Sequence, residues 1–286
     1  MKRKAKELER RGTARLRYRT VFRQTRTKAG MIIIFIFVLT AVFAPLIAPN
    51  DPLRVDVARK LEGPSASFWL GTDQLGRCIA SRLIWGSRNS LMYSGIVLLI
   101  TLMIGVPAGM VSGYFGGKLD SFMMRIIDIF MAVPSFIVAL AIAGTLGASG
   151  RNLVIAMSCV YWAAYARLVR GLTKQIKERS YVTALRAGGC RAGQIIFRHI
   201  LKNIAPSVIA LATIELGSVI LAIAGFSFIG LGVQPPNPEW GIMLSDSQSY
   251  IQTYPQLMIW PGLAIVAVVM AFNLLGDGIQ NGMAKS

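Results

Sequence analysis

Residues 90–113 read SLMYSGIVLLITLMIGVPAGMVSG, a stretch without a single charged side chain. About 18 or more apolar residues in one helix are enough to cross a hydrocarbon layer of roughly 30 Å. Helices of a soluble protein are usually shorter, and those at its surface carry a polar face. The stretch therefore predicts a transmembrane helix.

Five more apolar blocks lie on either side of this stretch. Together they predict six transmembrane helices, at about 29–48, 90–113, 123–145, 153–170, 205–228 and 258–277. The composition agrees, because hydrophobic residues make up 54% of the 286-residue chain and charged residues only 15%, with a mean hydropathy of +0.54. We expect an all-α membrane protein rather than a soluble one.

Lysine and arginine dominate the N-terminal arm, residues 1–28. The arm holds twelve of them against two glutamates, and so supplies +10 of the formal net charge of +18. Such an arm can bind nucleic acid, but it runs directly into the apolar block at 29–48, and basic residues beside a membrane span stay on the cytoplasmic side. No nucleic-acid partner is therefore expected. The arm is also too long for a cleaved signal peptide and no A-x-A site follows the block, which predicts an uncleaved first helix.

The connecting segments support this orientation. Segment 167–202, predicted to be cytoplasmic, holds nine Lys or Arg and one acid, whereas segment 228–257, predicted to be external, holds no Lys or Arg. Both termini are therefore predicted to be cytoplasmic. The chain divides into the basic arm at 1–28, a first helix with an external loop at 29–89, and a five-helix core at 90–282 with a basic cytoplasmic loop at about 171–204.

No metal site, disulfide or nucleotide site is predicted. The chain has one histidine, His199, and three cysteines without metal-type spacing, namely Cys78, Cys159 and Cys190. Gly116-Gly117-Lys118 is similar to the end of a phosphate-binding loop, but Leu119 stands where that loop needs Ser or Thr. If transport is driven by ATP, the nucleotide and its magnesium must be bound by a separate chain.

Arg125, Asp128 and Glu215 are ionisable residues that fall in the interior of predicted helices. Arg125 and Asp128 are three residues apart on one helix face, and we expect them to neutralise each other. Glu215 lies near the middle of the fifth block without a local partner. Because ionisable residues inside a membrane are costly and usually functional, Glu215 either lines a pathway for a cation or pairs with a residue on another helix.

Small residues and prolines add local predictions. Gly105, Gly109 and Gly113 recur every four residues, and such spacing lets two transmembrane backbones approach closely. Pro134 predicts a kink in the third helix, and Pro261 predicts the start of the sixth.

Four ordered motifs resemble one known family. The basic loop reads YVTALRAGGCR from Tyr181 and IIFRHILKNIAP from Ile195. This is similar to the coupling-loop motif of bacterial binding-protein-dependent ABC importer permeases. Three further stretches, found at 70–83, 228–241 and 271–278, read LGTDQLGR with SRL, FIGLGVQPPNPEWG, and AFNLLGDG. They resemble the dipeptide/oligopeptide/nickel branch of that family, and the resemblance spans about residues 30–282.

The chain departs from the family pattern at several positions. Thr183 stands where the coupling motif has Glu, and Leu185 and Gly188 also differ, while Gly189 fits the family glycine. Cys78 replaces the Asp of the family's G-R-D block. These departures put in doubt any contact that the missing Glu would make.

The resemblance implies a fold and a set of partners. The fold would be that of a type I ABC importer permease, working with a second related permease, two ABC ATPase subunits and an external substrate-binding protein. Ala184, Arg186 and Gly189 would couple this chain to an ATPase, whereas Glu239 and Trp240 would shape an outer gate or the surface on which the binding protein docks. The chain itself would hold no catalytic residue, and the ATPase subunits would bind ATP and magnesium.

The cargo is less constrained. The segments at 161–167, 246–251 and 258–262, together with Glu215, are more similar to nickel-type subunits than to peptide-type ones. We therefore expect nickel or a metal chelate to be carried past Glu215, with di- and oligopeptides as the alternative. An intramembrane enzyme or a channel is a remote alternative, because no predicted helix holds a histidine and nothing resembles a selectivity filter.

Overall fold

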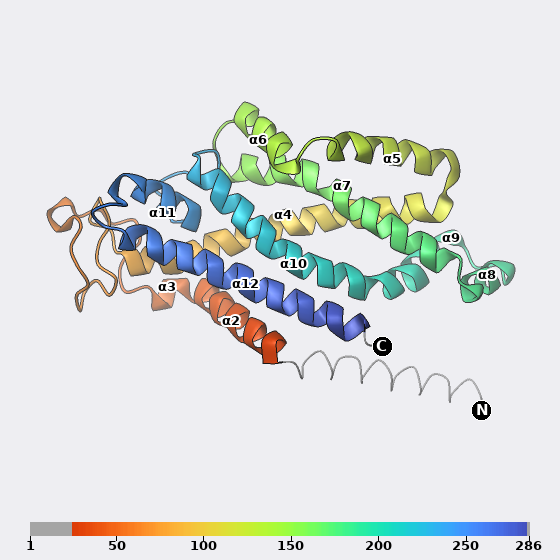
Figure 1. Cartoon of the computed structure of the whole chain (residues 1–286), viewed down its shortest axis with the longest axis horizontal. Helices are drawn as coiled ribbons and strands as arrows, with labels where there is room; N and C mark the ends of the chain where they lie inside the picture. Colours follow the sequence, from red (N-terminus) through yellow and green to blue (C-terminus); the bar gives the residue numbers. More distant parts are fainter. Residues whose placement is uncertain (1–24, 285–286) are drawn as a thin grey trace.

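The computed structural model describes residues 25–284, and this part of the chain is built from helices and connecting loops (Figure 1). Its α-helices are α2 Thr25–Val42, α3 Ala44–Ile47, α4 Ile79–Phe115, α5 Gly117–Met131, α6 Ser135–Leu146, α7 Gly150–Lys177, α8 Ser180–Ala187, α9 Ala192–Gln194, α10 Leu201–Phe228, α11 Trp240–Ser247 and α12 Gln256–Ala284. Short 3₁₀ turns lie at Val57–Arg59 and Gln248–Tyr250, and a π-helical segment, Ile195–Ile200, leads into α10.

The described residues hold five to six candidate membrane spans, against the six that were predicted. Five helices are long and apolar enough to cross a membrane, and the pair α5 and α6 makes a sixth that is bent by 79°. The break spans residues 132–134 and ends at Pro134, whose ring cannot continue a helix, so the predicted kink is confirmed.

Two predicted boundaries were wrong. Helix α4 begins at Ile79, eleven residues before the predicted block. Its polar first turns are stabilised at one end of the bundle, where Arg82 pairs with Asp73 and Asp246. Pro261 lies inside α12 rather than at its start. A proline leaves the carbonyl four residues before it without its helical donor, and here the Leu257 carbonyl accepts the Ser247 hydroxyl at 3.3 Å.

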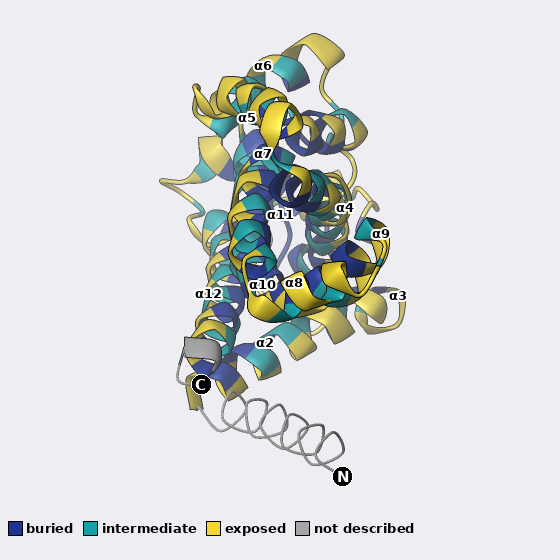
Figure 2. Cartoon of the chain, turned by 90° about the vertical axis from the view of Figure 1, so that its right-hand side faces the viewer, coloured by how far each residue is buried: buried dark blue, intermediate teal, exposed yellow. Residues whose placement is uncertain are grey.

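The helices form one elongated bundle (Figure 1). α4 packs along α7, α10 lies beside α12, and α2 covers α12 from the outside. One end of the bundle holds α8 and α9 (the α8 end), and the start of α2 and the end of α12 point toward it. The opposite end holds α11 and the loop at 48–78 (the α11 end). Viewed from the α8 end, buried residues gather along the centre while α5 and α2 expose their outer faces (Figure 2).

The glycine stripe on α4 explains the closeness of α4 and α7. A Cβ at Gly105 would stand 2.7 Å from the Trp162 carbonyl oxygen, and one at Gly109 would stand 2.5 Å from that of Ala166. Carbon and oxygen atoms cannot approach so closely without a clash, so only glycine allows this separation of the two helices. The predicted packing role of the stripe is confirmed.

Candidate coupling and translocation sites

Helix α8 is a short amphipathic helix held outside the main bundle. Val182 is fully buried, and Tyr181 and Leu185 pack beside it in an apolar cluster with Ile195 and Ile200. Because these side chains lie on one face, they fix α8 against the start of α10 and leave its other face free.

The free face of α8 carries small side chains. Thr183, Ala184 and Ala187 are exposed, as are Gly188 and Gly189, which follow the helix. A narrow ridge of this kind suits insertion into a groove on another protein. The predicted residues Ala184 and Gly189 therefore lie on the same exposed surface.

Gly189 ends α8 in a left-handed conformation. Its φ is +79°, the Gly189 amide donates to the Arg186 carbonyl at 3.0 Å, and the Cys190 amide donates to the Leu185 carbonyl at 3.0 Å. These two bonds make a Schellman cap, which normally needs glycine at this position. Gly189 thus sets the direction in which the chain leaves the helix.

Arg186 contacts the bundle instead of sharing the small-residue ridge. Its guanidinium lies 5.0 Å from the centroid of the Tyr114 ring, and its Nε lies 3.4 Å from the Tyr114 hydroxyl. Lys177 approaches the same ring at 5.8 Å. Arg186 therefore joins α8 to the last turn of α4 through a cation–π contact.

Glu215 lies in α10, facing α7. Glu215 is partly buried, and α10 packs against α7, the helix that carries Tyr161 and Tyr165. No salt bridge to Glu215 is formed within residues 25–284. The Tyr165 hydroxyl is buried without a hydrogen-bond partner from the described residues, and so are the Thr101 and Ser158 hydroxyls. Buried hydroxyl groups without a partner from the described residues therefore lie on both α4 and α7.

The expected pairing of Arg125 with Asp128 was wrong. Asp128 instead forms an ion pair with Arg167 of α7, because α5 lies along α7 and turns Asp128 toward it. Asp120, two turns earlier on α5, is held by Arg170 at 2.5 Å and by Lys174 at 2.7 Å. These acids fasten α5 to α7.

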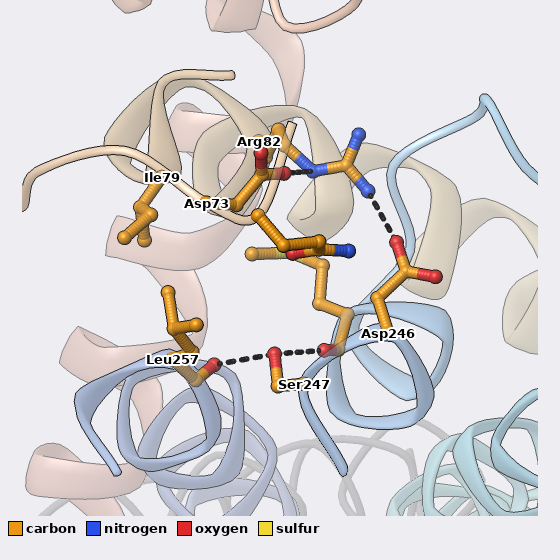
Figure 3. A pocket seen from close by; sticks show the side chains of 8 residues that line it. Asp73, Ile79, Arg82, Asp246, Ser247 and Leu257 are labelled. Carbon is orange, nitrogen blue, oxygen red and sulfur yellow. Dashed lines mark hydrogen bonds and ion pairs between the residues drawn. The ribbon is translucent and has the colours of Figure 1, made fainter. Parts of the chain in front are cut away.

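A buried charge network ties together the α11 end. Asp73 pairs with Arg77 at 2.6 Å and with Arg82 at 3.4 Å, and Asp246 of α11 pairs with the same two arginines at 3.0 and 3.4 Å. Figure 3 shows Arg82 between Asp73 and Asp246, beside a cavity of about 10 Å³. The two arginine side chains are only 3% and 2% exposed, so two full positive charges are matched by two buried or partly buried carboxylates.

Glu239 and Trp240 begin α11 and are fully enclosed. The Glu239 carboxylate accepts the Ile242 amide at 3.1 Å as a helix cap and the Ser90 hydroxyl at 2.9 Å. Burial raises the pKa of the Glu239 carboxyl above its usual range. Trp240 donates from its indole nitrogen to the Leu83 carbonyl at 3.1 Å. Neither side chain has exposed surface with which a binding protein could dock, so within this chain they position α11, and a gate role stays a prediction.

Sequence reasoning missed the charge network as a site. Asp73, Arg77 and Arg82 all belong to the family-like motif at residues 70–83, and that motif is the only sequence feature that pointed to them. Nothing local connects them to Asp246, which is more than 160 residues away along the chain. The network forms only in the folded chain, where α11 packs against the start of α4.

Comparison with known proteins identifies the family. The family described as binding-protein-dependent transport system inner membrane component matches residues 105–286, and the N-terminal transmembrane domain of oligopeptide transport permease C matches residues 16–64. The first match covers more than half of the chain.

Similar proteins carry different names. The dipeptide transport system permease protein DppC of Alkalihalophilus pseudofirmus is 39% identical over 93% of this chain and 89% of its own length. The nickel transport system permease protein NikC of Escherichia coli K12 is 40% identical over 89% and 92%. The glutathione transport system permease protein GsiD of Pectobacterium atrosepticum is 38% identical over 93% and 89%.

A solved structure supports the fold. A chain of the MetNI methionine ABC transporter in an inward-facing conformation superposes with a TM-score of 0.56 at 20% identity, covering 71% of this chain and 96% of that one. The expected type I importer permease fold is confirmed at the level of architecture. The chain therefore belongs to the family of binding-protein-dependent transport inner-membrane components, in its peptide/nickel branch, and is a multi-pass protein of the bacterial inner membrane.

Proposed function

We propose that this chain is one of two permease subunits of an ATP-driven importer, and that α8 is the element that an ATPase subunit grips. The observation that carries the proposal is the shape of α8. It offers a ridge of small residues outward while Val182 and Arg186 fix it to the bundle. ATP would be hydrolysed by separate chains, in line with a family of transport permeases.

The partners follow from this proposal. A second related permease would complete the pathway, two ATPases would act on the α8 ends, and an external binding protein would deliver cargo at the α11 end. This orientation places both termini and α8 in the cytoplasm, which the basic segment 167–202 supports. Intramembrane hydrolase and channel functions have no support from the family or from the described residues.

For the cargo we propose nickel or a metal chelate that passes Glu215. A partly buried carboxyl group on a membrane helix suits a cation better than a neutral solute. Within residues 25–284 no group of three or more His, Cys, Asp or Glu could hold a metal ion, so this chain would pass the cargo on rather than store it. Di- and oligopeptides are the second candidate, because the DppC relative is as similar as the NikC relative.

Uptake of radioactive nickel tests this proposal in cells that carry the complete transporter. We expect uptake that competing peptides do not reduce and that Glu215→Gln lowers at least tenfold. Ser218→Ala is the matched control, because Ser218 is exposed on the same helix, three residues further on. Peptide import without nickel uptake, with Glu215→Gln fully active, would overturn the nickel assignment and make Glu215 a packing residue.

A further inference from the structure

One face of α5 forms an open hollow at the α8 end of the membrane-spanning region. The hollow is shallow and wide open, with a volume of about 650 Å³, and it is lined by Gly117, Lys118, Asp120, Ser121, Phe122 and Arg125. Positions 118, 122 and 125 are spaced as i, i+4 and i+7 and so lie along one side of the helix. Lys118, Ser121, Phe122 and Arg125 are all exposed.

The two cations in this hollow lack acidic partners. The acids of α5 are engaged elsewhere, because Asp120 binds Arg170 and Lys174 and Asp128 binds Arg167. Within residues 25–284, neither Lys118 nor Arg125 forms a salt bridge. The hollow therefore carries a local charge of about +2 that the fold does not neutralise.

The position of Arg125 makes this charge costly. It lies seven residues into the span from Lys118, about 10 Å along the helix axis. Next to it Phe122 is 62% exposed, and Ile129, one turn beyond Arg125, is 73% exposed. A guanidinium beside an exposed apolar surface in a membrane needs an anion or must extend toward water.

A phospholipid with an anionic head group satisfies all of these features at once. Its phosphate can lie between the Lys118 and Arg125 side chains, near the Ser121 hydroxyl and the first turn of α5, where the helix dipole also favours negative charge. Its acyl chains can cover Phe122 and Ile129. Anionic lipids are abundant in the cytoplasmic leaflet, and basic pockets on that side of membrane proteins bind them.

We propose that the α5 hollow, formed by Lys118, Ser121, Phe122 and Arg125, is a binding site for the head group of an anionic phospholipid. The buried Asp120, which lies on the opposite side of α5, holds the helix against α7 through Arg170 and Lys174, and Asp128 at the edge of the same face pairs with Arg167. The lipid therefore occupies the outer face of a helix that is already fastened to the bundle, and it neutralises the two remaining charges.

Native mass spectrometry of the full chain in a non-ionic detergent tests this proposal. The probes are dioleoylphosphatidylglycerol and dioleoylphosphatidylcholine, titrated separately. We expect the affinity for phosphatidylglycerol to fall about fivefold for Arg125→Gln and about 25-fold for the double substitution Lys118→Gln with Arg125→Gln, as expected for the loss of one and two interfacial charges. Binding of phosphatidylcholine should not change.

Two variants serve as controls. Arg125→Lys keeps the charge and should retain most of the affinity for phosphatidylglycerol. Arg198→Gln removes an exposed charge elsewhere at the α8 end and should have no effect. Equal melting temperatures for all variants in the same detergent would show that the fold is intact, as expected for exposed side chains.

Three results would overturn the proposal. One is an affinity for phosphatidylglycerol that Arg125→Gln leaves unchanged. Another is displacement of the lipid by an excess of inorganic phosphate, which would make the hollow a site for free anions. The last is an Arg125→Gln variant that still binds phosphatidylglycerol but no longer co-purifies with the second permease in the complete transporter, which would assign Arg125 to that partner.

Discussion

The left-handed backbone angle of Gly189 determines the direction in which the chain leaves α8. A left-handed residue with a side chain costs about 1–2 kcal/mol relative to glycine, and a β-branched side chain costs more. A Cβ at Gly189 would meet no neighbouring atom within 4 Å, so any effect of a substitution there arises from the backbone and not from a clash.

Gly189→Val should uncouple ATP hydrolysis from transport. The new residue disfavours the turn at φ +79°, so the chain leaves α8 in another direction and the helix no longer fits its partner. We expect uptake by the complete transporter to fall at least tenfold while the amount of protein in the membrane is unchanged. Gly193→Val is the control, because Gly193 also has open space around it and no left-handed angle. Normal uptake in cells with Gly189→Val would contradict the proposal that α8 couples this chain to an ATPase.

At the residue scale, local conformation was predictable from the sequence, whereas long-range side-chain contacts were not. The glycine after α8 was predictable because few other residues adopt that turn. The partner of Arg186 was not predictable, because Tyr114 is 72 residues away and the motif gives no direction for the side chain. The pairing of Asp128 failed for a similar reason, since helical spacing favoured Arg125 and tertiary packing favoured Arg167.

At the scale of elements, the seam between α4 and α7 depends on glycine more than on side-chain contacts. Gly109→Ala should destabilise the protein by about 1–3 kcal/mol, the usual cost of overpacking, because the new Cβ would stand 2.5 Å from the Ala166 carbonyl oxygen. Gly95→Ala on the same helix meets nothing within 4 Å, and it should be neutral or stabilising by up to about 1 kcal/mol. Thermal unfolding in detergent compares the two, and equal melting temperatures would contradict this account.

The helical elements were largely predictable from hydrophobic length, since the membrane demands a minimum apolar run. Their ends were not predictable from that criterion, because α4 continues through Arg82 and Arg88, well beyond its apolar stretch. The Arg82 side chain can be buried there only because Asp73 and Asp246 compensate its charge. Likewise α5 and α6 were predicted as one helix with a kink, but the bend of 79° makes them two separate segments.

At the scale of the whole molecule, Asp246 joins parts of the chain that are distant in sequence. Asp246→Asn should leave Arg77 and Arg82 with Asp73 alone. Removing one partner from a buried ion pair costs about 3–5 kcal/mol, and partial exposure of Asp246 places the effect near the lower end. We expect a lower melting temperature and faster hydrogen exchange in the loop at 48–78.

Asp56→Asn is the control for this change. It breaks the pair of Asp56 with Arg59, whose side chains are 37% and 51% exposed, and such surface pairs contribute little. If Asp56→Asn and Asp246→Asn have the same effect on hydrogen exchange, the buried network does not hold the loop.

The length of α4 has a mechanical consequence. With 37 residues it is roughly 55 Å long, nearly twice the thickness of a hydrocarbon layer. Its first turn carries Arg82 of the charge network, and its last turn carries Tyr114, on which Arg186 of α8 rests. A helix resists compression along its axis, so α4 acts as a strut between the two faces of the membrane. If α8 is gripped by an ATPase as proposed, a push on α8 would reach Asp246 and α11 as a displacement along this helix, and Pro107 would be the point at which the helix bends.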